Sequence, residues 1–93
     1  MIAFTKRLIV PQNVLLQELG GESVLLNLNT EYYFGLDETG TRMWSALTSS
    51  ATIEAAFDVL LSEYDVAPAV LRRDLGALAE NLIKHGLLEL RDE

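Results

Sequence analysis

The stretch EYYFGLDETGTRMW at residues 31–44 constrains the fold of this chain more than any other segment. An aromatic strand pattern runs to Leu36, and Asp37 then stands where a carboxylate can cap a helix that carries Trp44. A strand that leads directly into a capped helix predicts a sheet edge beside a helical layer. Such an edge can bind an extended peptide without any catalytic residue.

Two strand patterns precede this stretch. The first covers residues 13–19 and ends at Gly20-Gly21, a two-residue loop typical of tight hairpins. The second covers residues 22–28, in which three apolar residues share one face: Val24, Leu26 and Leu28.

The third strand, over residues 31–36, follows a turn predicted at Asn29-Thr30, since asparagine tolerates positive φ and bonds its own backbone. One face of this strand carries large side chains, those of Tyr32, Phe34 and Leu36. The three strands together predict an antiparallel meander.

Three helix patterns follow. Asp37 caps the first, over residues 38–49, Thr52 begins the second, and Pro68 stands in the first turn of the third, which Gly86 ends. This order predicts an α+β, winged helix-turn-helix-like fold, in which a three-stranded antiparallel sheet is followed by three helices.

The organisation predicts a single domain over residues 13–90, with residues 1–12 as an N-terminal arm or an extra edge strand because Pro11 interrupts their apolar run. The 93 residues, 49% of them hydrophobic, suffice for one small core. With no cysteine, the chain has no disulfide and no thiolate metal site, which fits a reducing cytoplasm. No signal-peptide pattern or membrane-length apolar run is present, so we expect a cytoplasmic protein.

Few residues offer chemistry. The single histidine, His85, has no partner for metal binding, and Asp37-Glu38 is explained by helix capping. We therefore expect no catalysis, metal or cofactor. The net charge of −7 argues against nucleic acid as a partner. Only Arg72-Arg73, near the start of the third predicted helix, favours the alternative of a winged-helix DNA-binding protein.

Most of the chain resembles the PqqD-like family, the leader-peptide recognition domains of pathways that modify ribosomally made peptides. The resemblance covers about residues 13–90, and it is carried by four features in a fixed order: Tyr33-Phe34-x-Leu36, Gly40-x-x-x-Trp44, Asp74-Leu75 and Gly86-Leu87-Leu88. It implies that the leader segment of a precursor peptide docks as an extra strand on the edge of the third strand, against the third helix. The residues expected to bind it are Glu31, Tyr32, Tyr33, Phe34, Gly35, Val70, Leu71, Asp74, Leu75, Ala77 and Leu78.

Within that family, residues 25–44 look closer to the standalone proteins of lasso-peptide pathways. The family members of quinone-cofactor synthesis usually carry a Pro-Glu-Gly-like turn before the third strand, where this chain has Asn29-Thr30. The resemblance thus implies an adaptor that delivers its precursor to a leader peptidase and then to a cyclase. The quinone-cofactor chaperone is the alternative within the family. A monomer and a dimer are both compatible with an open strand edge.

Overall fold

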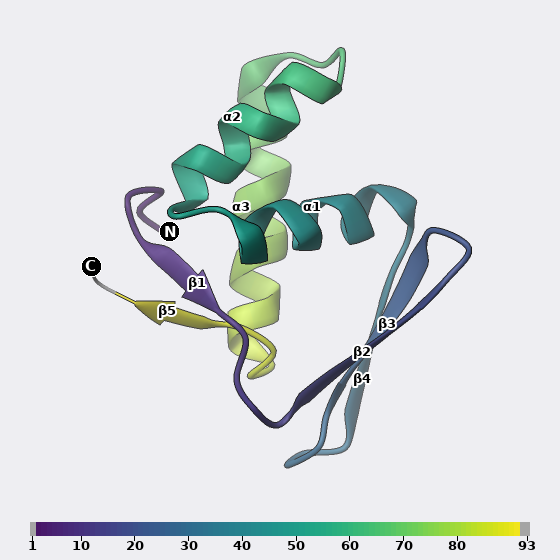
Figure 1. Cartoon of the computed structure of the whole chain (residues 1–93). Coiled ribbons are helices and arrows are strands. Elements are labelled where there is room, and N and C mark those ends of the chain that lie inside the picture. The colour runs from purple at the N-terminus through teal and green to yellow at the C-terminus, as the bar shows by residue number, and fades with distance from the viewer. Residues whose placement is uncertain (1, 92–93) are drawn as a thin grey trace.

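The computed structural model of the chain describes residues 2–91, which form five strands and three helices. In chain order these are β1 (Arg7–Ile9), β2 (Val14–Leu19), β3 (Glu22–Asn27), β4 (Tyr32–Leu36), α1 (Glu38–Ser49), α2 (Ile53–Glu63), α3 (Pro68–Lys84) and β5 (Glu89–Arg91). Strands β2, β3 and β4 form an antiparallel sheet in that order, and the three helices follow it (Figure 1). The predicted α+β fold is therefore confirmed.

Both sheet turns lie where they were predicted, but the second is built differently. Gly20 and Gly21 have φ angles of +60° and +89°, values that glycine adopts without strain. In the second turn the positive φ falls on Glu31, at +61°, rather than on Asn29. The side chain that bonds the turn backbone is that of Asn27, two positions before the Asn29 that we expected to make this bond.

The helices begin at the predicted caps. The side chain of Asp37 accepts a 2.7 Å hydrogen bond from the backbone N–H of Gly40, and Thr52 caps α2 in the same way. Pro68 is the first residue of α3, where its missing N–H costs nothing. None of the helices within residues 2–91 is both long and apolar enough to cross a membrane.

Gly86 ends α3 with a φ of +71° and turns the chain back onto the core. The N–H of Leu87 bonds the carbonyl of Leu82 at 2.8 Å, and that of Gly86 bonds the carbonyl of Ile83 at 3.0 Å. This pair of bonds is the Schellman pattern of helix termination. As a result Leu87 and Leu88 are buried, and the chain continues into β5.

The helices cover one face of the three-stranded sheet and leave the other open. The covered face carries Leu25, which is fully buried beneath the helices, together with Ser23 and Asn27. Val24 and Leu28, predicted to share a face, do so on the open side, where they are 43% and 49% exposed. Strand alternation was thus read correctly from the sequence, but the apolar set of residues 22–28 is the solvent-facing one.

The N-terminal residues do not extend the three-stranded sheet. Strand β1 pairs antiparallel with β5. This two-stranded ribbon and the three-stranded sheet lie on opposite sides of the C-terminal end of α3 (Figure 1). Just before β1, the carbonyls of Phe4 and Lys6 accept hydrogen bonds from the N–H groups of Glu54 and Ile53 at the start of α2. Residues 2–9 thereby bond the N-terminus of α2 and pair with β5, the strand that follows α3. Met1 lies outside the described residues.

Candidate functional site

Strand β4 forms one outer edge of the sheet. It pairs with β3 on one side, and no other strand of residues 2–91 pairs with its second side. An edge strand leaves alternate backbone N–H and C=O groups without a partner, and a second chain can pair with them. The other outer edge belongs to β2.

The hydrogen-bond pattern identifies which residues of β4 present free backbone groups. Leu28 donates its N–H to the carbonyl of Asn13, on the β2 side, whereas the carbonyl of Asn27 accepts from Glu31, on the β4 side. Because backbone direction alternates along a strand, every second residue of β3 from Asn27 backwards bonds β4. Their partners in β4 are Tyr32, Phe34 and Leu36. The outward groups on the free edge are therefore those of Tyr33 and Gly35.

Three aromatic rings join β4 to the end of α3. The ring of Tyr32 is stacked on that of His85, with centroids 4.1 Å apart and planes within 10°. The ring of Phe34 lies 6.2 Å from His85 and 6.4 Å from Tyr32, tilted to both. We call these three residues the aromatic cluster. Offset and tilted rings at such distances attract one another, so the cluster fixes the position of β4 beside the end of the helix.

A hollow opens beside the aromatic cluster, between the turn before β4 and the end of α3. Glu31 and Tyr32 line it from the turn and the strand, and Lys84 and His85 line it from the helix. The hollow therefore places one acidic and one basic residue beside an aromatic surface.

The buried side chain of Asn27 connects β3 to the end of α3 and to the turn before β4. Its side-chain amide donates to the carbonyl of His85 at 3.0 Å, and its side-chain oxygen accepts from the Asn13 amide and from the backbone of the following turn. Asn27 is only 4% exposed. A Cβ on Gly86 would lie 2.8 Å from the same amide, so the glycine also makes room for it. Buried polar groups bonded at both ends fix a local structure strongly.

Sequence reasoning missed Asn27 and the contact of His85 with β4. His85 was expected to be a helix-capping or exposed residue, and it is indeed the C-cap of α3, but its ring is half of a stacked pair. Alternation places Asn27 on the same face as Leu25, but only the structure shows that this face is the buried one, so no clear signal for Asn27 is present in the sequence.

On α3, three of the predicted contact residues lie toward the core. Leu71 and Leu75 are buried, at 4% and 0% exposure, so they pack the helix against the core and present no surface to a peptide. Leu78 is partly buried and packs against that core. Of the three, only Leu78 retains an accessible side.

The other three predicted residues of α3 are exposed. Val70 is 39% exposed. Asp74 forms an ion pair of 3.2 Å with Arg73, so its carboxylate already has one partner at the surface. Ala77 lines a hollow together with Ile2 and Phe4 of the N-terminal residues.

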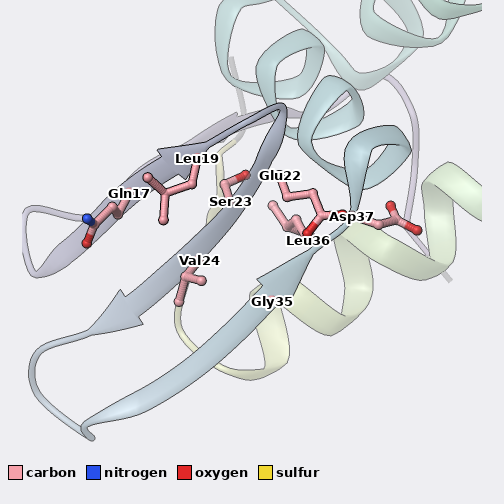
Figure 2. Close-up of a pocket in the computed structure, with 8 residues that line it drawn as sticks. All are labelled: Gln17, Leu19, Glu22, Ser23, Val24, Gly35, Leu36 and Asp37. Atoms are coloured by element: carbon pink, nitrogen blue, oxygen red, sulfur yellow. The ribbon is translucent and has the colours of Figure 1, made fainter.

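The open face of the sheet carries a second hollow beside the free edge. Gly35, Val24, Glu22 and Asp37 are among the residues that line it (Figure 2). Next to it, Tyr33 is 67% exposed. The edge strand is thus flanked by accessible surface on both faces of the sheet.

The arginine pair proposed for DNA recognition is engaged in contacts within the chain. Arg72 makes a 2.8 Å ion pair with Glu54, and its guanidinium lies over the rings of Phe4 and Phe57, at 4.6 and 4.4 Å from their centroids. Arg73 faces the carboxylate of Asp74. Arg72 is thus engaged by contacts within the chain, whereas the side chain of Arg73 remains 72% exposed.

A third arginine, Arg42, forms an exposed ion pair with Glu63 that joins α1 to α2. Hydrogen bonds from Arg42 lower the pKa of Glu63, and those same bonds raise the pKa of Arg42. Because the lowered pKa belongs to the folded state, the pair stabilises the fold above the ordinary pKa of a glutamate. That contribution is lost as the pH falls through the folded value. This ion pair contains no residue of β4. Residues 2–91 also contain no group of three histidine, cysteine, aspartate or glutamate residues that could bind a metal ion.

Comparisons with known proteins agree with this geometry. Residues 22–88 match the sequence model of the family described as coenzyme PQQ synthesis protein D (PqqD). The solved structure of TbiB1 in complex with the TbiA(β) leader peptide superposes with a TM-score of 0.81 and 34% sequence identity, covering 90% of this chain and 98% of TbiB1. No curated protein sequence gives a match. The matched span includes the sheet edge formed by β4 and the whole of α3, and the chain belongs to the PqqD family.

Proposed function

We propose that this protein binds the leader segment of a ribosomally made precursor peptide as an added strand on the free edge of β4. The observation that carries the proposal is the pair of outward backbone groups at Tyr33 and Gly35, on an edge strand flanked by accessible surface. A related protein that is 34% identical, TbiB1, has been solved with a leader peptide bound. Backbone pairing of this kind supplies affinity, and side-chain pockets on both faces supply specificity.

An added strand would place alternate side chains on opposite faces of the sheet. Those on the covered side would meet the aromatic cluster and the near side of α3, where Phe34 and Leu78 are partly buried and Val70 is exposed. Leu71 and Leu75 would act indirectly by holding α3 in place. Ala77 faces a different hollow and would contribute least.

The charges around the edge favour a basic leader. The chain carries fourteen acidic against seven basic residues, and Glu31 and Asp74 flank the proposed binding surface. Complementary charge increases the rate of encounter and selects among partners more than it raises affinity. Because Asp74 already pairs with Arg73, its contribution to the leader would be shared.

In the lasso-type pathway that the sequence suggests, the protein would perform no chemistry itself. It would hold the precursor and deliver it to a separate leader peptidase and then to an ATP-dependent cyclase. Holding a substrate near an enzyme raises its effective concentration, so moderate affinity suffices. The second candidate function is binding of the precursor peptide of quinone-cofactor synthesis, since the matching family model is named for that pathway.

Titration of a fluorescently labelled synthetic leader peptide, from the precursor encoded beside this gene, tests the proposal by anisotropy. We expect saturable binding with a Kd of about 1 µM or tighter, which corresponds to roughly −8 kcal/mol. Removing the core segment of the precursor should leave that Kd unchanged. Absence of binding to every neighbouring precursor would refute the assignment.

Replacing Phe34 by alanine should weaken leader binding about tenfold, because central aromatic side chains carry much of the energy of a peptide interface. Asp74→Arg, on the α3 side, should weaken binding of a basic leader as well. The matched control is Phe4→Ala, which removes another partly buried ring packed on the core, beside the hollow that Ala77 lines. If Phe4→Ala weakens binding while Phe34→Ala and Asp74→Arg do not, the peptide occupies that other hollow.

A further inference from the structure

The open face of the sheet contains a row of side chains that is incomplete at the free edge. Gln17 of β2 pairs with Val24 of β3, and Val24 pairs with Gly35 of β4, so the three residues lie side by side on this face. The neighbouring row ends instead in a large side chain, that of Tyr33. The hollow in Figure 2 lies where the first row lacks its last side chain.

The space at this position is open. A Cβ built on Gly35 would meet no heavy atom within 4 Å, and Val24 next to it is 43% exposed. The apolar floor is therefore accessible from the edge of the sheet.

We propose that the hollow over Gly35 is a second specificity site, which receives a large apolar side chain, preferably aromatic, from the residue of the bound leader that pairs with Gly35. The inference rests on the proposed function, since it requires a strand on the β4 edge. Neighbouring strands lie about 4.8 Å apart, so a ring on the added strand reaches across a glycine to the next side chain. Aromatic side chains cover strand glycines in this way and stabilise them.

The position has a polarity as well as a size. Two acidic residues, Glu22 and Asp37, are among the residues that line the hollow, and the carboxylate of Asp37 accepts a hydrogen bond from the N–H of Gly40. An acidic side chain at this leader position would meet like charge, which disfavours it. The open face of the sheet thereby adds selectivity at one leader position, the residue that pairs with Gly35.

A size-complementation experiment tests the assignment. Gly35→Val introduces a residue that suits strands at a position with free space, so the variant should fold, as circular dichroism and a thermal melt would verify. We expect its affinity for the natural leader to fall at least tenfold in the anisotropy titration. In a scan of leader variants, alanine at one position should restore binding to Gly35→Val while weakening binding to the natural protein.

The control is Leu15→Val, which places the same side chain on the open face at the far end of the neighbouring row, outside the residues that line the hollow, and should leave the affinity within twofold. Unchanged affinity of a folded Gly35→Val, or loss of affinity that no single alanine substitution in the leader restores, would overturn the second site. Either of those results leaves leader binding itself intact. A natural protein that fails to bind any leader would instead overturn the proposed function together with the site.

Discussion

Tyr33→Pro is expected to fold and yet to lose leader binding by about 2–4 kcal/mol, roughly 30-fold to 1,000-fold in Kd. Proline has no N–H, and Tyr33 presents its N–H on the free side of β4. A leader carbonyl that should accept this bond would be left without a partner against the proline ring. Edge strands tolerate proline where the N–H points to solvent, so the sheet itself should persist. Anisotropy and a thermal melt measure the two effects separately.

Glu18→Pro is the matched control on the opposite edge of the sheet. By the same alternation, Glu18 of β2 presents its N–H away from β3. The substitution therefore makes the same backbone change on the edge that the leader is not expected to use, and affinity should stay unchanged. Normal binding by a folded Tyr33→Pro would contradict strand addition at β4, and a selective loss in Glu18→Pro would move the peptide to β2.

Asn27→Asp should lower the free energy of unfolding by about 2–4 kcal/mol, the second large effect that we expect. The aspartate side chain has the same shape, and its carboxylate can still accept the bonds that now reach the Asn27 oxygen. It cannot donate to the carbonyl of His85, and it places a buried negative charge beside that oxygen. Urea denaturation followed by circular dichroism measures the change.

Asn29→Asp provides the comparison, because it makes the same chemical change two residues away at an exposed position. Its unfolding free energy should stay within about 0.5 kcal/mol of the natural value. If both variants were equally stable, the bond from Asn27 to the end of α3 would not be a significant source of stability. The aromatic cluster would then be positioned by ring packing alone.

Elements with local signals could be predicted from the sequence. The glycine hairpin, the caps at Asp37 and Thr52, and the helix stop at Gly86 each depend on residues within a few positions of one another. The same holds for the apolar stripes of the helices, since helical periodicity is also local. The fold class followed because the order of such elements leaves few ways to cover one sheet.

Features that join distant segments could not be predicted. No pattern in residues 1–12 predicts that β1 pairs with β5, more than 70 positions away. Nor does any pattern there predict that the backbone of Phe4 bonds the start of α2. The stack of Tyr32 on His85 is likewise a contact across most of the chain. Which face of β3 is covered also depended on where the helices pack, and an alternating strand with apolar residues on both faces does not reveal it.

The candidate site shows the same division. Its backbone edge on β4 was predicted from a local strand pattern and from resemblance to a family. The contribution of α3 was implied by the same resemblance, and helical spacing alone does not separate a core leucine such as Leu75 from an accessible residue such as Val70. The hollow over Gly35 arises only from the register of three strands.

The most direct test of leader binding at β4 is amide hydrogen exchange of the ¹⁵N-labelled protein, followed by NMR with and without saturating leader peptide. In the free protein the outward N–H groups of Tyr33 and Gly35 should exchange rapidly, and the bound leader should slow both. The outward groups of Leu16 and Glu18 on β2 should remain fast in either state. Unprotected Tyr33 and Gly35 at saturation, or protection that appears on β2 instead, would contradict strand addition at β4.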